Sequence, residues 1–551
     1  MSKVYSFCLI GIVFILLAGT LKAQSTGDHR SKQSGNWNLA ANWERFDGTW
    51  TDAVSAPSST DGVITILSGH TIDINVAVTA DQLVVAAGGT LTLKGNQTLT
   101  LANGAGDDLT IHGTFIWNDG YQIEGPGNVM ISSTGTFTEN FANNKQLTAP
   151  LTNNGIFNWQ STNIGLSSAA ITITNNGTMN ITSNHYIIGT SATVVNGATG
   201  IINKNSAGVN TLIQVGLFEN NGVINLNAGT FTNNSQTFNN NGTIHFNTGS
   251  FFQDGATTKE FNQNVGSAFT GTGSFTLRSK MNLNTNLSFP VGLNCLFATD
   301  GTFIVDGSGA LTINNDFSWW GTFQGSGALT VNGNIIWVGG NLNRPLTIGA
   351  PYSLTFAATS TQNYIGATLT NNGTLNWQSN RDIVIETNSP FTNNGTFNIS
   401  GNAGLYNGPV ITSFVNNGTI SKSSSGQTIF QVHHFTNAGS GTIKGTGTFL
   451  LHNHTSFSNN GTIEPGLSPG ILNFNAYNTL NDPLTANSIL RFEIAGNGGA
   501  GQPTGHDQLT RAPQPGFGML NNLPLAGTLT VVETGTVPDG SYTIIQLTSG
   551  T

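Results

Sequence analysis

Charged residues are scarce in this sequence. Lys, Arg, Asp and Glu together make up 8 % of the 551 residues, whereas an ordinary soluble domain carries about 25 %. No run of Lys or Arg occurs and the net charge is −9, so we predict no nucleic-acid partner and no attraction to an anionic membrane. The shortage of titratable groups also argues against catalysis, because acid–base chemistry needs paired groups close to one bond.

Cysteine and long apolar runs are almost absent as well. The longest apolar run, residues 7–17, follows Lys3 and ends shortly before Gln24, a pattern typical of a signal peptide. We therefore predict a signal peptide at 1–23, export to the medium or the outer cell surface, and no transmembrane segment, since a span needs ~20 apolar residues. The mature chain then keeps only Cys295, which cannot form an internal disulfide.

Glycine, asparagine and threonine take the place of the missing charges, and they recur at a regular spacing. The tripeptide Asn-Asn-Gly occurs eight times, beginning at Asn153, Asn175, Asn220, Asn240, Asn371, Asn393, Asn416 and Asn459. Apart from one long gap, neighbouring copies lie 20 to 23 residues apart or at about twice that spacing. A period of this length is typical of one coil of a β-solenoid.

Apolar and polar residues alternate around each copy. In Ile156-Phe157-Asn158-Trp159 every second residue is a large apolar one, as in a half-buried strand. We interpret Asn-Asn-Gly as the bend before that strand, because Asn and Gly tolerate positive φ. Coils stacked ~4.8 Å apart would bring equivalent Asn side chains into a hydrogen-bonded ladder.

These patterns predict an all-β fold: a right-handed parallel β-helix with coils of about 22 residues. The helix is expected over residues 61–464, after a capping segment at 24–60 and before a C-terminal β module at 465–551. Four tryptophans stand at inward positions of the alternation and are predicted to lie in the core: Trp117, Trp159, Trp337 and Trp377.

A second level of repetition lies above the coil. Residues 109–117 recur at 329–337, and residues 151–161 recur at 369–379, so that both pairs are separated by nearly the same length of chain. We predict a tandem duplication of two blocks, about 105–246 and 325–465, that superpose coil for coil. Trp159 and Trp377 would then occupy the same face.

Three stretches resemble known families. Ser-Gly-Asn-Trp at 34–37, together with the strand at 61–66 and Gly-His-Thr at 69–71, resembles the opening of secreted β-solenoid proteins of Bacteroidota and the G8-type domain. The Asn-rich coils are similar to the passengers of autotransporter-like and filamentous adhesins. Residues 464–470, and His-Asp-Gln-Leu at 506–509, are similar to the last part of autotransporter-type passengers. The resemblance implies extracellular display and no reaction, and it leads us to expect further sequence after Thr551.

Many β-helix proteins are polysaccharide lyases or hydrolases, which gather several carboxylates on one side. Asp107 and Asp108 are the only adjacent acidic pair in the coils, and no acid follows one coil later, at 128–132. We interpret them as turn residues and predict no catalytic residue, no cofactor and no enzymatic activity. A carbohydrate-active enzyme remains the alternative.

Four histidines are a weak candidate for a zinc or copper site, because they fall into two groups about one coil apart. They are His433, His434, His452 and His454. The register set by neighbouring phenylalanines keeps His433 and His454 apart, and only a slip of one residue would bring them together. We therefore predict no bound metal.

Some tryptophans lack the strand period and could contact a glycan: Trp37, Trp43, Trp50, Trp319 and Trp320. The alternative is that the first three cap the open end of the core. One of the adjacent pair must point outward, because neighbouring side chains of a strand point to opposite sides. Taken together, the sequence predicts a non-catalytic secreted or cell-surface protein of structural or adhesin-like type. Its expected partners are extracellular polysaccharide or a host or neighbouring surface.

Overall fold

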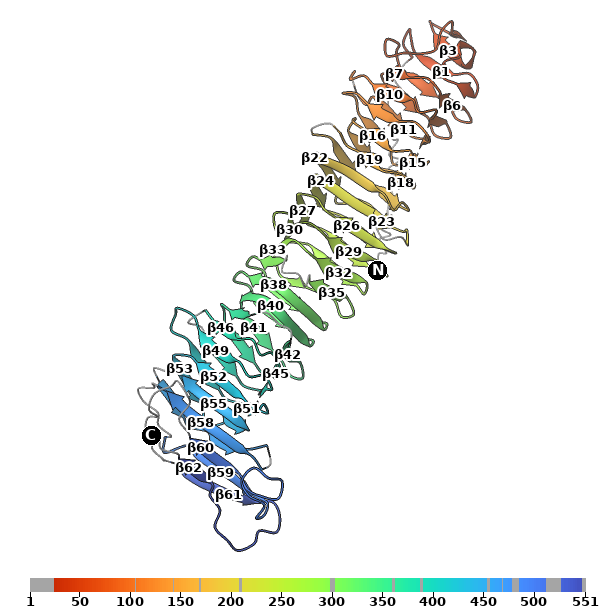
Figure 1. The fold of residues 1–551 in the computed structure, drawn as a ribbon. Coiled ribbons are helices and arrows are strands. Elements are labelled where there is room, and N and C mark those ends of the chain that lie inside the picture. Colours follow the sequence, from red (N-terminus) through yellow and green to blue (C-terminus); the bar gives the residue numbers. More distant parts are fainter. Residues whose placement is uncertain are drawn as a thin grey trace, which may run out of the picture.

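The computed structural model of this chain describes twelve stretches: 24–104, 106–141, 143–167, 170–207, 211–297, 303–358, 362–386, 390–452, 456–467, 469–477, 485–511 and 527–547. The predicted signal peptide, residues 1–23, lies outside them. The described residues form one long rod in which strands β1 to β62 follow one another (Figure 1). Their only helical turn is the 3-10 helix η1, Ala40–Asn42, so the prediction of an all-β chain is confirmed.

Most coils of the rod consist of three short strands separated by bends. In one coil these are β17 (Leu151–Asn153), β18 (Ile156–Trp159) and β19 (Ile164–Gly165). We name the three sides of the rod face 1, face 2 and face 3 after these strands, in that order. Each strand pairs in parallel with the equivalent strand of the next coil, as β17 does with β20 (Thr172–Asn175), where Leu151 lies opposite Ile173. The chain is therefore a β-solenoid of about 18 turns with coils of roughly 22 residues, as predicted.

The three faces join into three sheets. Face 2 forms an 11-stranded sheet from β2 (Gly35–Asn36) to β31 (Ala268–Gly271) and a 9-stranded sheet from β34 (Leu287–Ser288) to β56 (Ser456–Asn459). Faces 3 and 1 are continuous in one 42-stranded sheet, because four long strands pass round the bend between them without a break. These strands are β22 (Tyr186–Asn196), β24 (Thr211–Asn220), β38 (Phe317–Gln324) and β40 (Ile335–Asn343).

The apolar core fills the inside of the rod. In β18, Phe157 is buried while its neighbour Ile156 is exposed to solvent. Inward aromatic rings stack from coil to coil, as Phe218 and Phe238 do with ring centroids 4.8 Å apart. All four tryptophans predicted to lie in the core are buried: Trp117, Trp159, Trp337 and Trp377. Cys295 is buried and unpaired, so packing and coil-to-coil hydrogen bonds hold the rod together.

The first Asn of each Asn-Asn-Gly motif is buried at the end of a strand. Except at Asn459, which ends its ladder and donates to the carbonyl of Gly461, its side-chain amide donates a hydrogen bond to the side-chain oxygen of the equivalent residue one coil later. This confirms the predicted ladder. The first ladder runs through Asn153, Asn175, Asn196, Asn220, Asn240 and Gln263, with N···O distances of 2.6 to 3.0 Å. The second runs through Asn371, Asn393, Asn416, Asn437 and Asn459, with distances of 2.6 to 2.7 Å.

The glycine of the motif is required because a side chain would not fit there, and not because it adopts a positive φ. This corrects the interpretation of Asn-Asn-Gly as a bend with positive φ. No residue of an Asn-Asn-Gly motif has a positive φ. A Cβ atom at Gly177 would lie 2.3 Å from the carbonyl oxygen of Gly155, and one at Gly418 would lie 2.0 Å from that of Gly395. Successive bends therefore stack so closely that any side chain at this position would collide with the coil below.

The two similar blocks of the sequence do not share an orientation. Asn153 ends a strand of face 1, whereas its counterpart Asn371 ends β44 (Leu369–Asn371), which belongs to face 2. Trp159 lies on face 2, whereas Trp377 lies on face 3, at the end of β45 (Thr374–Trp377). The prediction that these two tryptophans share a face is wrong: the second block is turned by one face about the axis of the rod.

Short coils around the start of the second block explain this turn. Leu311 of β37 (Leu311–Ile313) lies opposite Leu329 of β39 (Leu329–Val331), which in turn lies opposite Leu346 of β41 (Leu346–Ile348). These coils are several residues shorter than those that carry the Asn-Asn-Gly motifs. Ten steps along face 2 lead from β18 to β44, and β45 is the next strand of the chain. The separation between equivalent residues of the two blocks thus spans ten coils and one further strand.

The N-terminal segment predicted to cap the solenoid, residues 24–60, shares the sheet of the first coils. Its strand β1 (His29–Ser31) pairs in parallel with β5 (Ile64–Ile66). The hairpin of β3 (Trp43–Phe46) and β4 (Trp50–Asp52) then extends the sheet on the other edge of β1 in antiparallel fashion. This change of direction ends the parallel stack.

The C-terminal segment is likewise continuous with the coils before it. Strand β58 (Ile471–Tyr477) pairs in parallel with β55 (Gly447–His452), and β60 (Gln508–Arg511) pairs in parallel with β58. Ile471 lies opposite Gln508, so this coil is much longer than those before it. The C-terminal β segment therefore shares the sheet of the solenoid and differs from the preceding coils by its longer connections.

Candidate functional site

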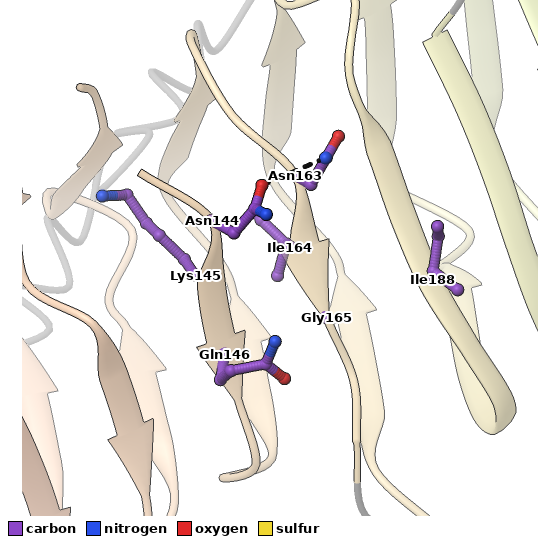
Figure 2. Close-up of a pocket in the computed structure, with 7 residues that line it drawn as sticks. All are labelled: Asn144, Lys145, Gln146, Asn163, Ile164, Gly165 and Ile188. Atoms are coloured by element: carbon purple, nitrogen blue, oxygen red, sulfur yellow. Dashed lines mark hydrogen bonds between the residues drawn. The ribbon is translucent and has the colours of Figure 1, made fainter. Parts of the chain in front are cut away.

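Face 3 is hollowed where β19 shortens to two residues. Gly165 has no side chain to fill the space between Gln146 of β16 (Lys145–Leu147) and Ile188 of β22 (Figure 2). The hollow has a volume of about 200 Å³ and is lined by Asn144, Lys145, Gln146, Asn163, Ile164, Gly165 and Ile188. Neither its position nor its shape follows from a sequence motif.

Neutral amides and two isoleucines, Ile164 and Ile188, form most of the wall of this hollow. The side-chain amide of Asn163 donates to Oδ1 of Asn144 at 3.1 Å. Oε1 of Gln146 is buried without a hydrogen-bond partner among the described residues, and Ile188 is 39 % exposed. These groups can bind hydroxyls and cover an apolar ring face, but they cannot transfer a proton at neutral pH.

The Lys145 side chain turns away from the hollow and into the core (Figure 2). Its Nζ lies 3.8 Å from Oε1 of Glu139, and both side chains are fully buried. Burial raises the pKa of the Glu139 carboxyl and lowers the pKa of the Lys145 ammonium. Backbone N–H groups of Gln160 and Ser161 also donate to Glu139, at 3.2 and 3.0 Å. This ion pair is an internal element of the coil and does not reach a ligand on the surface.

The candidate histidines do not converge in the part of the chain that is described. His434 lies on β53 (His434–Asn437) of face 2 and contacts the hydroxyl of Ser456 at 2.8 Å. His452 ends β55 on face 1 and contacts Oε1 of Gln431 at 2.9 Å. His433 accepts a hydrogen bond from the backbone N–H of Thr412 at 3.2 Å. His454 lies outside the described residues, and those that are described contain no cluster of metal-ligating side chains.

Three of the five tryptophans proposed to contact a glycan are buried, which corrects that prediction. Trp37 and Trp43 pack edge to face with ring centroids 4.9 Å apart, and they belong to the core that runs through the rod. Nε1 of Trp43 donates to the carbonyl of Trp37 at 2.8 Å. Trp319 is buried in β38. The first two therefore cover the end of the core, and none of the three has a ring face free for a sugar.

Trp50 and Trp320 reach the surface only in part. The guanidinium carbon of Arg30 lies 4.3 Å above the Trp50 ring, and Phe46 packs against the same ring at 5.3 Å. Trp320 points outward from β38, opposite to Trp319, as strand geometry requires. These two rings are the aromatic groups of the predicted set that a ligand can touch.

A carboxylate pair was missed by the sequence analysis. Asp81 lies one coil before Asp107 and Asp108, whereas only the following coil was searched for acids. Burial, and then the hydrogen bond and charge of Asp108, raise the pKa of Asp81. Asp108 is buried and accepts the backbone N–H groups of Gly104 and Asn128 at 3.1 and 2.8 Å. Asp108 therefore acts as a turn residue, as predicted, and Asp81 is its partner across the coils.

Compared with known proteins, the chain matches no protein-family model, no curated protein and no solved structure. Among the described residues, no helix has the length and apolar character needed to cross a membrane.

Proposed function

We propose that this chain is a non-catalytic structural protein of the secreted or outer cell surface, of adhesin-like type, which contacts glycans. Its neutral outer surface carries the proposal. Along face 2, from β6 (Thr71–Ile74) to β56, the outward side chains are almost all Thr, Asn, Ser, Ile or Val. Within the described strands of this face, only Asp73, His245 and His434 are outward side chains that titrate. Lys94, just after β9 (Thr90–Leu93), pairs with Asp73 at 2.6 Å.

A surface of this composition suits attachment better than chemistry. Hydroxyl and amide side chains offer many hydrogen bonds of modest strength, and a long rod repeats them at every coil. The hollow above Gly165 adds neutral amides beside the exposed Ile188. None of these groups is an acid or a base of the kind that glycosidic cleavage requires.

Export and display rest on the N-terminal pattern of Lys3 and residues 7–17. The resemblance to secreted Bacteroidota solenoids and to autotransporter passengers supports the same placement. Cell fractionation, with N-terminal sequencing of the exported chain, tests it: a mature protein outside the cytoplasm that begins at Gln24 is expected. A full-length cytoplasmic protein would overturn this part of the proposal.

Binding without turnover is tested on the mature chain from Gln24 onward. We expect retention on at least one of pectin, alginate, glycosaminoglycan or glucan, with no release of reducing or unsaturated ends. Retention on none of them, together with no attachment to cells, would refute the proposal.

A carbohydrate-active enzyme is the second candidate, and the pair of Asp81 and Asp108 is the observation that favours it. A carboxyl with a raised pKa beside a second carboxyl is an arrangement that acid–base catalysis uses. The test compares product release from glycans by the wild type and by two variants. If the wild type releases products, Asp81→Asn abolishes the release, and the control Asp107→Asn, which alters an exposed acid, leaves it unchanged, the chain is an enzyme.

A further inference from the structure

Two rows of uncharged side chains run along face 2 in the first block. They project from β18, β21 (Thr178–Ile181), β23 (Ile201–Lys204) and β25 (Val223–Leu226), which pair in register. One row carries methyl groups and the other carries amides. The methyl row is Ile156, Thr178, Ile201 and Val223, and the amide row is Asn158, Asn180, Asn203 and Asn225. We call these residues the first Thr–Asn surface.

The amides of this surface form a regular ladder. Asn180, Asn203 and Asn225 each donate to the amide of the preceding coil, at 3.0, 3.0 and 2.8 Å. One N–H group and the remaining lone pair of each side chain are left for a ligand. In the methyl row, Ile156 and Ile201 are 41 % and 37 % exposed. A coil therefore offers one apolar contact and one hydrogen-bonding group, side by side.

The second block carries the same surface on another face. Its rows lie on face 3, on β45, β48 (Thr396–Ile399) and β51 (Thr419–Lys422), again in register. The members of this second Thr–Asn surface are Thr374, Asn376, Thr396, Asn398, Thr419 and Ser421. The amide of Asn398 donates to Asn376 at 3.0 Å. Because the second block is turned by one face, the two surfaces point in different directions about the rod.

Neither Thr–Asn surface contains a charged side chain, in contrast to face 1. On face 3 the second surface ends where Lys444 follows Ser421 in register one coil later. On face 1, Glu219, Glu260 and Lys280 project outward, and Glu260 and Lys280 form an ion pair at 3.3 Å. An anionic polymer would gain no ion pair on either Thr–Asn surface, and a cationic one would gain none either. The complementary partner is neutral.

The spacing of the rows points to a polymer that repeats along the rod. Coils follow one another every ~4.8 Å, which is close to the advance of an extended polysaccharide for each sugar ring. One ring per coil can then lay its apolar face on the methyl row and direct a hydroxyl to the amide row. Single contacts of this kind are weak, and a row of them binds through their number.

We propose that each Thr–Asn surface binds one chain of a neutral, extended polysaccharide, so that the protein cross-links two chains. This inference rests on the proposed glycan-contacting function and names its ligand class and its valency. A single sheet of polymer cannot lie on both surfaces at once, because they face different directions. The protein therefore bridges chains and does not coat them.

The test uses the mature chain with two neutral probes, xyloglucan and mixed-linkage β-glucan, and two anionic probes, polygalacturonate and alginate. Affinity is measured by titration, and cross-linking is measured by light scattering of the mixture. Asn203→Glu places a charge in the first surface and Asn398→Glu in the second. Asn262→Glu, which alters an outward amide of face 1, is the matched control, and circular dichroism verifies that each variant is folded.

The wild type should bind the neutral probes and raise the scattering, and Asn262→Glu should do the same. Each surface variant alone should still bind but lose the scattering, and the double variant should bind at least about tenfold more weakly. Unchanged binding by the double variant, equal loss in the control, or a preference for the anionic probes would overturn the inference. Binding to anionic polymers or to cells, but not to neutral polysaccharides, would refute this inference and leave the proposed function intact. Binding to none of them would refute both the inference and the proposed function.

Discussion

The buried amide ladder makes one strong prediction about stability. Asn196 is fully buried and takes part in four hydrogen bonds. It accepts from Asn175 at 2.7 Å and donates to Asn220 at 2.8 Å, and to the carbonyls of Gly200 and Val223 at 3.2 Å each. Replacement by alanine removes all four hydrogen bonds at a fully buried position.

The size of the effect follows from those partners. Leaving a buried polar group without a partner costs about 1–3 kcal/mol. The amide of Asn175 keeps a second acceptor, the carbonyl of Ile201 at 3.2 Å, and the carbonyl of Gly200 keeps the backbone N–H of Val223 at 2.9 Å. The main loss therefore falls on Oδ1 of Asn220 and on the carbonyl of Val223. We expect Asn196→Ala to destabilise its own coil and the neighbouring coils by about 3 kcal/mol.

The half-buried outer ladder of the same coil supplies the control. Asn203 has one amide hydrogen bond to Asn180 and accepts one from Asn225, but water can replace both. Asn203→Ala should therefore cost less than about 1 kcal/mol. Local free energies of opening from hydrogen exchange suit a repeat protein, whose coils can open separately. If the two variants lose the same stability, the amide ladder is not a stabilising element and the argument fails.

Three further outcomes can be measured. Burial lowers the pKa of both Lys204 and Lys422 to about 8. Between pH 8 and pH 10.5 the unfolded lysine therefore still holds a proton that the folded one has lost. Raising the pH through this window should stabilise the rod by up to about 3 kcal/mol per lysine. Thermal melts of the double variant with Met at both positions should show a smaller rise, and an unchanged rise would contradict the assignment. Burial raises the pKa of Asp507 to about 6, so acidification from pH 7 to pH 4 should stabilise the C-terminal coils against exchange, and Asp507→Asn should remove that dependence. Trp43→Ala should open the first coils by about 3–5 kcal/mol and leave exchange near Trp159 unchanged; a loss spread along the whole rod would show that the coils do not behave independently.

Strands and coil length could be predicted because each is encoded in a short stretch of sequence. The alternation around Phe157 and the spacing from Asn153 to Asn175 depend on one coil and its neighbour. The orientation of the second block depends on the sum of all coil lengths between the blocks. No Asn-Asn-Gly motif marks the coils of 247–345. The short register there shows only as Gly-Ser-Gly-Ala-Leu-Thr at 307–312, which recurs 18 residues later at 325–330, and a repeat based on Asn-Asn-Gly alone does not predict the turn by one face.

Surface features were harder to predict than strands for a related reason. The hollow above Gly165 exists because β19 is short, and no residue type announces a short strand. Asp81 escaped notice because bends vary in length, which hides the alignment of their residues between coils. Trp37 and Trp43 lie in a segment without a strand period, so their burial could not be inferred from alternation.

The length of the duplicated unit, ten coils and one strand, determines the direction in which the surface of each added copy points. An insertion of ten coils and one strand acts as a screw operation, with one third of a turn for every copy added. A third copy would present its surface on the one remaining side, and a fourth would return to the first. Lengthening the gene by this unit thus adds reach and new directions together, whereas a unit of whole coils would only have lengthened a single stripe.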